Sequence, residues 1–266
     1  MAKEITLGQY YPVDSPIHRM DPRTKLAGTI IYIVALFIAE GPLAYVLSAA
    51  FLFWGIKVSR VPLNYMMRGL KPIIMILLFS AVFNLFLVEG TPIVKIWRLT
   101  ITWEGLFRAI YMSIRLVFLI MASSLMTFTT TPNQLTDGLE VGLAPLKKIK
   151  VPVHEIAMMM SIALRFIPIL VDETDKITKA QTARGADFEN GKLIERVKNM
   201  IPLLVPLFIS AFRRASDLAM AMEARCYQGG EGRTKMKPLR YTKLDRNGYL
   251  ALFAYLMVII LLKIFL

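Results

Sequence analysis

Long apolar stretches alternate with short polar segments along this chain, and that alternation predicts helices that cross a membrane. A helix needs roughly 20 apolar residues to span the hydrocarbon core. The stretches that approach or meet this length cover residues 26–39, 43–56, 72–88, 105–128 and 249–266. The first two are short and only residues 40–42 separate them, so we interpret them as a helical hairpin whose flanking residues complete each crossing. The pattern predicts an all-α integral membrane protein with about five transmembrane helices.

The start of the first stretch carries a clear helix signal. Asp21 suits the N-cap position, because its side chain can accept a hydrogen bond from a free backbone N–H group of the first turn. Pro22 suits the first helical position, where no intrahelical N–H bond is required. We therefore expect the first helix to begin at Pro22.

Two further apolar runs, residues 156–171 and 200–212, are not expected to cross the membrane. The first contains Arg165 and Pro168, and the second has only about 13 residues, a length typical of a buried or interfacial helix. If both crossed, residues 172–199 would form an external loop with six Lys and Arg residues. Such a loop contradicts the preference of basic residues for the cytoplasmic side.

The predicted topology therefore has three parts and a cytoplasmic N-terminus. Residues 1–128 form a membrane bundle of four spans, residues 129–247 form a cytoplasmic domain, and residues 248–266 form the last span. The cytoplasmic domain holds 19 of the 32 Lys and Arg residues. It contains apolar helices that must be covered, and we expect its own bundle, the bilayer interface and partner proteins to cover them.

Composition supports the membrane class and narrows the chemistry. Hydrophobic residues make up 56% of the chain and the mean hydropathy is +0.53, whereas soluble domains are about 45–50% apolar. The net charge of +13 lies in the loops, which favours membrane topology over nucleic-acid binding. Cys226 is the single cysteine, and His18 and His154 are too distant in sequence to form a metal site alone. We expect no metal, no cofactor and no nucleic-acid partner.

The sequence gives no sign of catalytic machinery. The predicted spans contain no paired carboxylates and no nucleophile–base pair. The segment most similar to a phosphate-binding loop runs from Gly185 to Lys192, but five residues separate its glycines where four are required, and Leu193 replaces the required Ser or Thr. We therefore expect that the chain is not an enzyme.

A weak internal duplication lies in the predicted cytoplasmic domain. In each copy an apolar half that contains proline leads into a polar half, which ends in Ala-Arg and a small residue. The two endings are Ala183-Arg184-Gly185 and Ala224-Arg225-Cys226. An arginine at the end of an arm can clamp a carboxylate in a partner's groove, because its guanidinium has five donors and keeps its charge when desolvated. The alternative is that both arginines only interact with the negative end of the helix dipole.

Two arginines also lie within the fourth predicted span. Arg108 and Arg115 are seven positions apart and so share roughly one helix face. An intramembrane arginine is a candidate functional residue. Arg108 can reach the outer interface, however, and we favour a structural partner within the bundle for Arg115.

Several segments of the chain resemble the transmembrane T component of energy-coupling factor (ECF) transporters, the EcfT/CbiQ-type family. They are residues 18–26, 131–135, 162–168 and 180–186. The resemblance covers nearly the whole chain and is most specific in the central segments. One departure is that the second arm reads Ala-Arg-Cys, not Ala-Arg-Gly, which leaves the backbone geometry at Cys226 uncertain.

The resemblance implies a fold and a function. It implies a bundle in the bacterial cell membrane with long cytoplasmic coupling helices, whose two Ala-Arg motifs dock onto two ATPase subunits. ATP would be hydrolysed in those partners. A separate substrate-binding membrane protein would capture a vitamin or metal ion for import. The alternative is a self-contained secondary transporter or channel, which should place ionisable residues or broken helices in mid-membrane, and only Arg115 fits that requirement.

Overall fold

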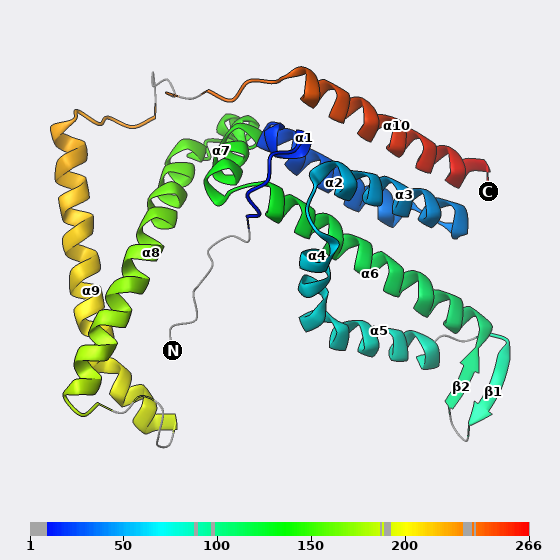
Figure 1. The fold of residues 1–266 in the computed structure, drawn as a ribbon, viewed down its shortest axis with the longest axis horizontal. Coiled ribbons are helices and arrows are strands. Elements are labelled where there is room, and N and C mark those ends of the chain that lie inside the picture. Colours follow the sequence, from blue (N-terminus) through cyan, green and yellow to red (C-terminus); the bar gives the residue numbers. More distant parts are fainter. Residues whose placement is uncertain are drawn as a thin grey trace. The chain divides into compact units, whose positions relative to one another are not determined.

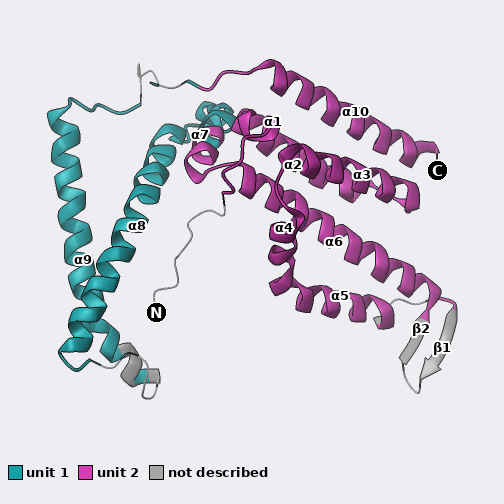
Figure 2. Ribbon diagram, in the orientation of Figure 1, with its two compact units in different colours: residues 1–7, 139–238 teal, residues 8–138, 239–266 magenta. Residues whose placement is uncertain are grey.

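A computed structural model describes residues 10–87, 90–96, 99–186, 188, 193–230, 236 and 238–265, with the backbone alone at residues 87, 92–96, 99–101, 193 and 195–197. The chain divides into two compact units (Figure 2). Unit 1 comprises residues 1–7 and 139–238, and unit 2 comprises residues 8–138 and 239–266. The larger part of unit 1, residues 139–238, is therefore inserted in sequence between two segments of unit 2.

Unit 2 is a helical bundle with one short β-hairpin (Figure 1). Its elements are α1 (Pro16–Arg19), α2 (Pro22–Ile38), α3 (Gly41–Ser59), α4 (Leu63–Leu70), a 3-10 turn (Lys71–Ile73), α5 (Ile74–Leu87), β1 (Pro92–Ile96), β2 (Leu99–Thr102), α6 (Trp103–Thr129) and α10 (Lys243–Phe265). The helix α7 (Pro132–Gly142) follows α6 and continues into unit 1. Unit 1 then contains a 3-10 segment (Ala144–Ile149), α8 (Val153–Ala183) and α9 (Leu193–Ala224).

The described residues form five helices that are long and apolar enough to span a membrane, which confirms the predicted fold class. They are Gly41–Ser59, Leu63–Phe86, Trp103–Thr129, Val153–Ala183 and Lys243–Phe265. The set differs from the expected one in two places. The 17 residues of α2 fall just short of a span by length, and α8 qualifies by length and composition.

The structure confirms the predicted start of the first helix, which depends on neighbouring residues alone. Pro22 begins α2, and the Asp21 carboxylate accepts the N–H of Arg23 as the expected N-cap. The expected hairpin of residues 26–39 and 43–56 corresponds to α2 and α3. Residues 57–71, interpreted as a loop, instead contain α4, whose Met66 and Leu70 are buried.

The expected loop 89–104 also has structure of its own. β1 and β2 pair as an antiparallel hairpin in which Ile96 lies opposite Leu99, so the all-α class holds with this one small exception. Trp97 and Arg98 lie outside the described residues, as does the predicted end of the third span at Val88.

An aromatic stack joins α2, α3 and α10 in the middle of unit 2. The rings of Phe51 and Tyr255 are stacked with centroids 4.5 Å apart, and the Tyr32 ring lies 5.6 Å from that of Tyr255. Ser48 is fully buried beside them; its hydroxyl lies 2.8 Å from the Tyr255 hydroxyl, and its carbonyl accepts the Tyr32 hydroxyl at 3.1 Å. Every hydroxyl of this stack is therefore satisfied within it.

A buried polar cluster, here called the polar clasp, joins the ends of α2, α6 and α10. The Lys25 ammonium donates to the carbonyls of His18 at 3.1 Å and Thr129 at 2.7 Å. Asp245 is fully buried. Its carboxylate accepts the N–H of Asp21 at 2.8 Å and both the N–H and the hydroxyl of Thr242 at 2.7 Å. One carboxylate therefore caps α10 and holds it to the start of α2.

Replacement of Asp245 by Asn should destabilise the chain by about 2 kcal/mol, because charge-assisted hydrogen bonds to two backbone N–H groups are weakened in a buried site. For a chain of this size that corresponds to a fall of roughly 4–8 °C in the midpoint of thermal unfolding. Unfolding in mild detergent, followed by circular dichroism, measures it. Asp14→Asn is the matched control, since Asp14 pairs with Arg19 on the exposed surface, where ion pairs contribute little. Equal melting temperatures for the two variants would contradict the assigned role of the clasp.

His18 in α1 gives a pH-dependent expectation. Burial lowers the pKa of His18 below its ordinary value of 6.5, so the unfolded chain takes up a proton at a higher pH than the folded chain does. Stability should therefore fall as the pH drops from about 6.5 toward the lower folded-state pKa. The difference in melting temperature between the native chain and His18→Gln, measured from pH 7.5 to 5.5, should shrink over that range; a constant difference would contradict the expectation.

Candidate functional site

The two predicted arms are α8 and α9, and both are single continuous helices. They have 31 and 32 residues, or about 46 and 48 Å at 1.5 Å per residue. Pro168 lies inside α8, and Pro202 and Pro206 lie inside α9. A proline removes one hydrogen bond from a helix interior, yet neither helix ends there. The apolar run and the polar run of each arm therefore form one rod.

The two arms pack against each other in opposite directions (Figure 1). Glu173 of α8 forms an ion pair with Arg214 of α9 at 3.0 Å, and the Gln181 amide donates to the Pro202 carbonyl at 3.4 Å. A later residue of α8 thus meets an earlier residue of α9. Arg184 consequently lies near the first part of α9, whereas Arg225 follows its last residue. The 23 residues from Pro202 to Arg225 place the arginines about 35 Å apart along the pair.

The first arm ends in a Schellman motif. Arg184 follows the last helical residue, Ala183, and Gly185 adopts a left-handed conformation with φ of +89°. The Gly185 N–H donates to the Thr182 carbonyl at 2.9 Å, and the Ala186 N–H donates to the Gln181 carbonyl at 3.0 Å. This pair of bonds satisfies two of the four carbonyls that a helix end leaves free. Gly185, the last residue of the Ala-Arg-Gly ending, thus directly follows the C-cap residue Arg184.

The second arm ends in the same motif with a different residue in the left-handed position. Cys226 has φ of +56° and donates its N–H to the Glu223 carbonyl at 2.8 Å. The Tyr227 N–H donates to the Met222 carbonyl at 3.0 Å. The backbone at Cys226, uncertain from the sequence, therefore matches that at Gly185. A side chain in this conformation costs about 1–2 kcal/mol, which Gly185 avoids.

Both arm-end arginines are exposed and available. The backbone N–H groups of the following residues satisfy two carbonyls at each helix end, and neither arginine side chain donates a hydrogen bond to a carbonyl of the described residues there. Among the residues that the structure describes, neither guanidinium has an ion pair or a side-chain hydrogen bond. Their neighbours Ala183, Gly185, Ala224 and Cys226 are exposed too. Each arm presents a free guanidinium between two small residues.

The guanidinium of Arg115, on α6, lies near the end of α2. Its guanidinium donates to the Ala39 carbonyl at 3.4 Å and lies 5.5 Å from the centre of the Phe37 ring and 5.9 Å from that of Tyr45. The favoured structural partner is therefore a carbonyl and two rings of the bundle. Within the described part of the chain it has no carboxylate partner.

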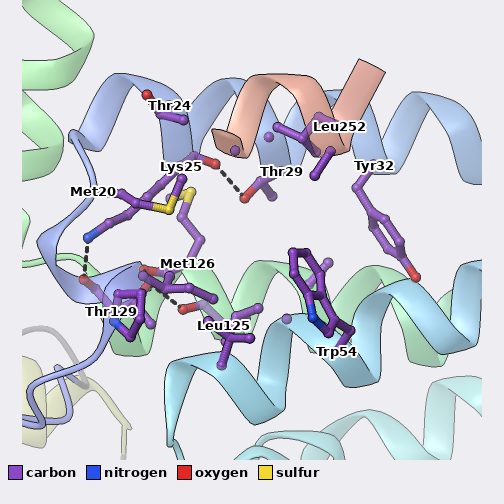
Figure 3. A pocket seen from close by; sticks show the side chains of 18 of the residues that line it. Met20, Thr24, Lys25, Thr29, Tyr32, Trp54, Leu125, Met126, Thr129 and Leu252 are labelled. Atoms are coloured by element: carbon purple, nitrogen blue, oxygen red, sulfur yellow. Dashed lines mark hydrogen bonds between the residues drawn. The ribbon is translucent and has the colours of Figure 1, made fainter. Parts of the chain in front are cut away.

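A largely apolar cavity of about 310 Å³ lies in unit 2 between α2, α3, α6 and α10. Figure 3 shows Trp54 from α3 and Leu252 from α10 on its walls, with Lys25 hydrogen-bonded to Thr129 at one end. Its lining includes no carboxylate and no histidine. The cavity therefore lacks the pair of groups that acid–base chemistry needs, and it does not bring the arm-end residues together.

The polar clasp is the main feature that the sequence did not predict. Asp245 and Lys25 are distant in sequence, and their pairing with backbone groups of other helices has no local signal. One part could have been found: Thr242 and Asp245 have the spacing of a capping box, in which the third helical residue returns a bond to the cap. That pattern predicts the observed start of α10 at Lys243, six residues before the expected Tyr249.

Comparisons with known proteins agree with this architecture. The chain matches the family model CbiQ, a cobalt transport protein, over residues 14–236. It is 55% identical over 245 residues to the energy-coupling factor transporter transmembrane protein EcfT of Ruminiclostridium cellulolyticum, with 92% of each chain covered. The protein of the same name from Acidaminococcus fermentans is 50% identical, with 99% of this chain and 98% of the relative covered. That of Bacillus subtilis is 49% identical, with 93% and 94% covered.

Cys226→Gly should stabilise the end of α9 by about 1 kcal/mol, because glycine adopts the left-handed conformation without a side-chain clash. Amide hydrogen exchange at Cys226 and Tyr227, whose N–H groups close the motif, should slow by about fivefold. Gly185→Ala is the reciprocal change and should accelerate exchange at Gly185 and Ala186 by a similar factor.

Ala224→Gly is the control, since it adds a glycine to the same segment at a helical position. That change should weaken the end of α9 by up to about 1 kcal/mol. Slower exchange in both α9 variants would indicate a general effect of glycine and would contradict the strain assigned to Cys226.

Proposed function

Because this chain belongs to the CbiQ/EcfT family of transmembrane transporter components, we propose that it couples two ATPase subunits to a substrate-binding membrane protein in an ATP-driven uptake transporter. Arg184 and Arg225 are the proposed docking residues, flanked by Ala183, Gly185, Ala224 and Cys226. The substrate class is a vitamin or a metal ion, and the substrate-binding partner selects it.

The observation that carries this proposal is the repetition of one helix end. Two exposed guanidinium groups are presented by the same backbone motif at opposite ends of one antiparallel helix pair. A guanidinium clamps a carboxylate through two parallel hydrogen bonds, and this geometry suits a partner groove. Two guanidinium groups that the same motif presents about 35 Å apart favour two similar partner subunits over one.

The arms can transmit motion because each is a continuous helix. When ATP binding draws the two ATPase subunits together, their grooves carry Arg184 and Arg225 to new positions. Since a helix is stiff, the displacement reaches the part of α8 and α9 that pairs through Glu173 and Arg214. The substrate-binding protein that rests on these helices is then tilted or released.

An exposed apolar stripe on α9 provides the surface on which a membrane partner can rest. Its members recur every three or four positions, as one face of a helix requires. They are Ile201, Leu204, Val205, Phe208, Ile209 and Phe212, with exposed fractions of 43–71%. Exposed apolar area of this kind marks contact with a partner or with lipid. We assign it to the substrate-binding membrane protein.

The proposed topology keeps residues 129–247 and the N-terminus in the cytoplasm. Length and composition would allow α8 to span a membrane, but its second half carries Asp172, Glu173 and Lys176 in one polar stretch. A crossing by both arm helices would also expose the six basic residues of 172–199 on the outer side, against the positive-inside preference. We therefore propose that α8 and α9 lie along the cytoplasmic face as coupling helices. Residues 1–128 then supply four spans and residues 248–266 the fifth.

The runner-up, a self-contained secondary transporter or channel, depended on Arg115 as a mid-membrane charge. The guanidinium contacts the carbonyl of Ala39 at the end of α2, which is a position for a structural or interfacial arginine. The coupling role is therefore the better supported of the two.

The Arg184→Ala/Arg225→Ala variant should lose its ATPase subunits. Affinity pull-down of tagged native and variant chains from detergent-solubilised membranes, with ATPase activity measured in each eluate, tests this. Retained activity should fall at least about tenfold, since a central arginine at an interface commonly contributes 2 kcal/mol or more. Each single variant should retain an intermediate amount.

Arg213→Ala is the matched control, because Arg213 is an exposed arginine on α9 away from both arm ends. It should retain native ATPase activity. Full retention of activity by the double variant would refute the docking assignment. Equal loss in the Arg213 control would indicate that net charge, and not the arm ends, recruits the ATPases.

A further inference from the structure

A second group of arginines lies in unit 2, in a pocket that the coupling role does not use. The pocket, here called the arginine pocket, has a volume of about 290 Å³ and is lined by Tyr45, Arg108, Tyr111, Met112 and Arg115. Tyr45 comes from the first turns of α3 and the other four from the first half of α6. The rings of Tyr45 and Tyr111 lie 5.1 Å apart and form one wall beside the two arginines.

The pocket carries positive charge that the protein does not neutralise. Neither Arg108 nor Arg115 forms an ion pair with any residue that the structure describes. Two acidic residues that the structure describes at this end of the bundle have other partners. Glu40 pairs with Lys263 at 2.8 Å, and Glu104 accepts the N–H of Thr91 at 2.8 Å. Charged residues within transmembrane segments are almost always paired, and among the described residues these two arginines have no counter-charge, so a bound anion can supply one.

The pocket also contains buried donors without acceptors. Tyr45 is 6% exposed, and its hydroxyl has no hydrogen-bond partner in the described part of the chain; the same is true of the buried Nε of Arg115. Arg115 makes a single long bond, 3.4 Å, to the Ala39 carbonyl. Buried polar atoms in folded proteins are nearly always satisfied. A ligand that satisfies these groups must be rich in acceptor oxygens and negatively charged.

The position of the pocket identifies the source of that ligand. It lies at the end of the bundle where α2 passes into α3, close to Ala39, whereas the polar clasp lies at the start of α2. Trp103 and Phe107, both half-exposed, occupy the first turns of α6, as aromatic residues do at the level of lipid headgroups. In the proposed topology this end faces outward, where unpaired arginines are otherwise disfavoured.

We propose that the arginine pocket binds the headgroup of an anionic phospholipid. Arg108 and Arg115 bind the phosphate oxygens through charge-assisted hydrogen bonds, for which guanidinium geometry is well matched. The Tyr45 hydroxyl donates a further bond, and Met112 contacts the apolar part of the lipid. Bound lipid of this kind anchors α3 and α6 at one depth in the bilayer.

Native mass spectrometry of the full chain in mild detergent tests the proposal. The chain is mixed with phosphatidylglycerol or with phosphatidylcholine at equal concentration, and retained lipids are counted. The native chain should retain one phosphatidylglycerol in preference to phosphatidylcholine. Affinity should fall about tenfold or more in Arg108→Gln/Arg115→Gln, as expected for lost hydrogen bonds to a charged group, and by a smaller factor in Tyr45→Phe.

Arg68→Gln is the matched control: Arg68 is exposed in the same unit on α4, with its guanidinium over the Tyr65 ring, and its loss should not change retention. Arg108→Gln alone decides the question if the double variant does not fold, because Arg108 is exposed and tolerates replacement.

Three results would overturn the proposal. They are unchanged phosphatidylglycerol retention in the arginine variants, equal retention of the two lipids by the native chain, and displacement of the lipid by excess inorganic phosphate. The last result would assign the pocket to a free anion.

Discussion

Hydrocarbon does not select among apolar helix faces, so polar contacts must set the register of helices in a membrane bundle. In this chain the polar clasp has that task. Asp245 binds the N–H of Asp21, and Lys25 binds the carbonyl of Thr129, so the first and last long helices and α6 meet at defined residues. Residues 139–238 of unit 1 are inserted between Gly138 and Leu239, and Leu239 lies three residues before Thr242, which the clasp holds. The clasp therefore joins segments of unit 2 that precede and follow the insertion.

Much of the helical architecture could be predicted from the sequence because its signals are local. The lengths of the apolar runs predicted the α2–α3 hairpin and α6, and Asp21-Pro22 predicted the start of α2. The clasp could not be predicted in the same way, since Asp245 and Asp21 are 224 positions apart and nothing in either segment identifies the other. The helix α4 was missed because its eight residues are too few for an apolar pattern to stand out from a loop.

The same difference between local signals and long-range contacts applies to the candidate site. The duplicated Ala-Arg endings were visible as residues, and the first cap followed from Gly185. That Cys226 adopts the same conformation could not be predicted, because the preference of a single non-glycine residue is overridden by the two hydrogen bonds of the motif. The partners of Arg115 also depend on how α2, α3 and α6 pack. The spacing of Arg108 and Arg115 placed them on one face but could not show that Tyr45 completes that face.

The ion pair between Glu173 and Arg214 has a geometric meaning within the duplication. The two residues are 41 positions apart, as are Arg184 and Arg225, so Glu173 and Arg214 occupy equivalent places in the two repeats. Equivalent points of two objects related by a twofold rotation can touch only on the axis. The pair therefore marks a pseudo-twofold axis, and each tip lies 11 residues, about 16 Å, beyond it. In the proposed coupling role, a rotation about this axis would move both tips through arcs of equal length, so the two proposed ATPase positions would be mechanically equivalent.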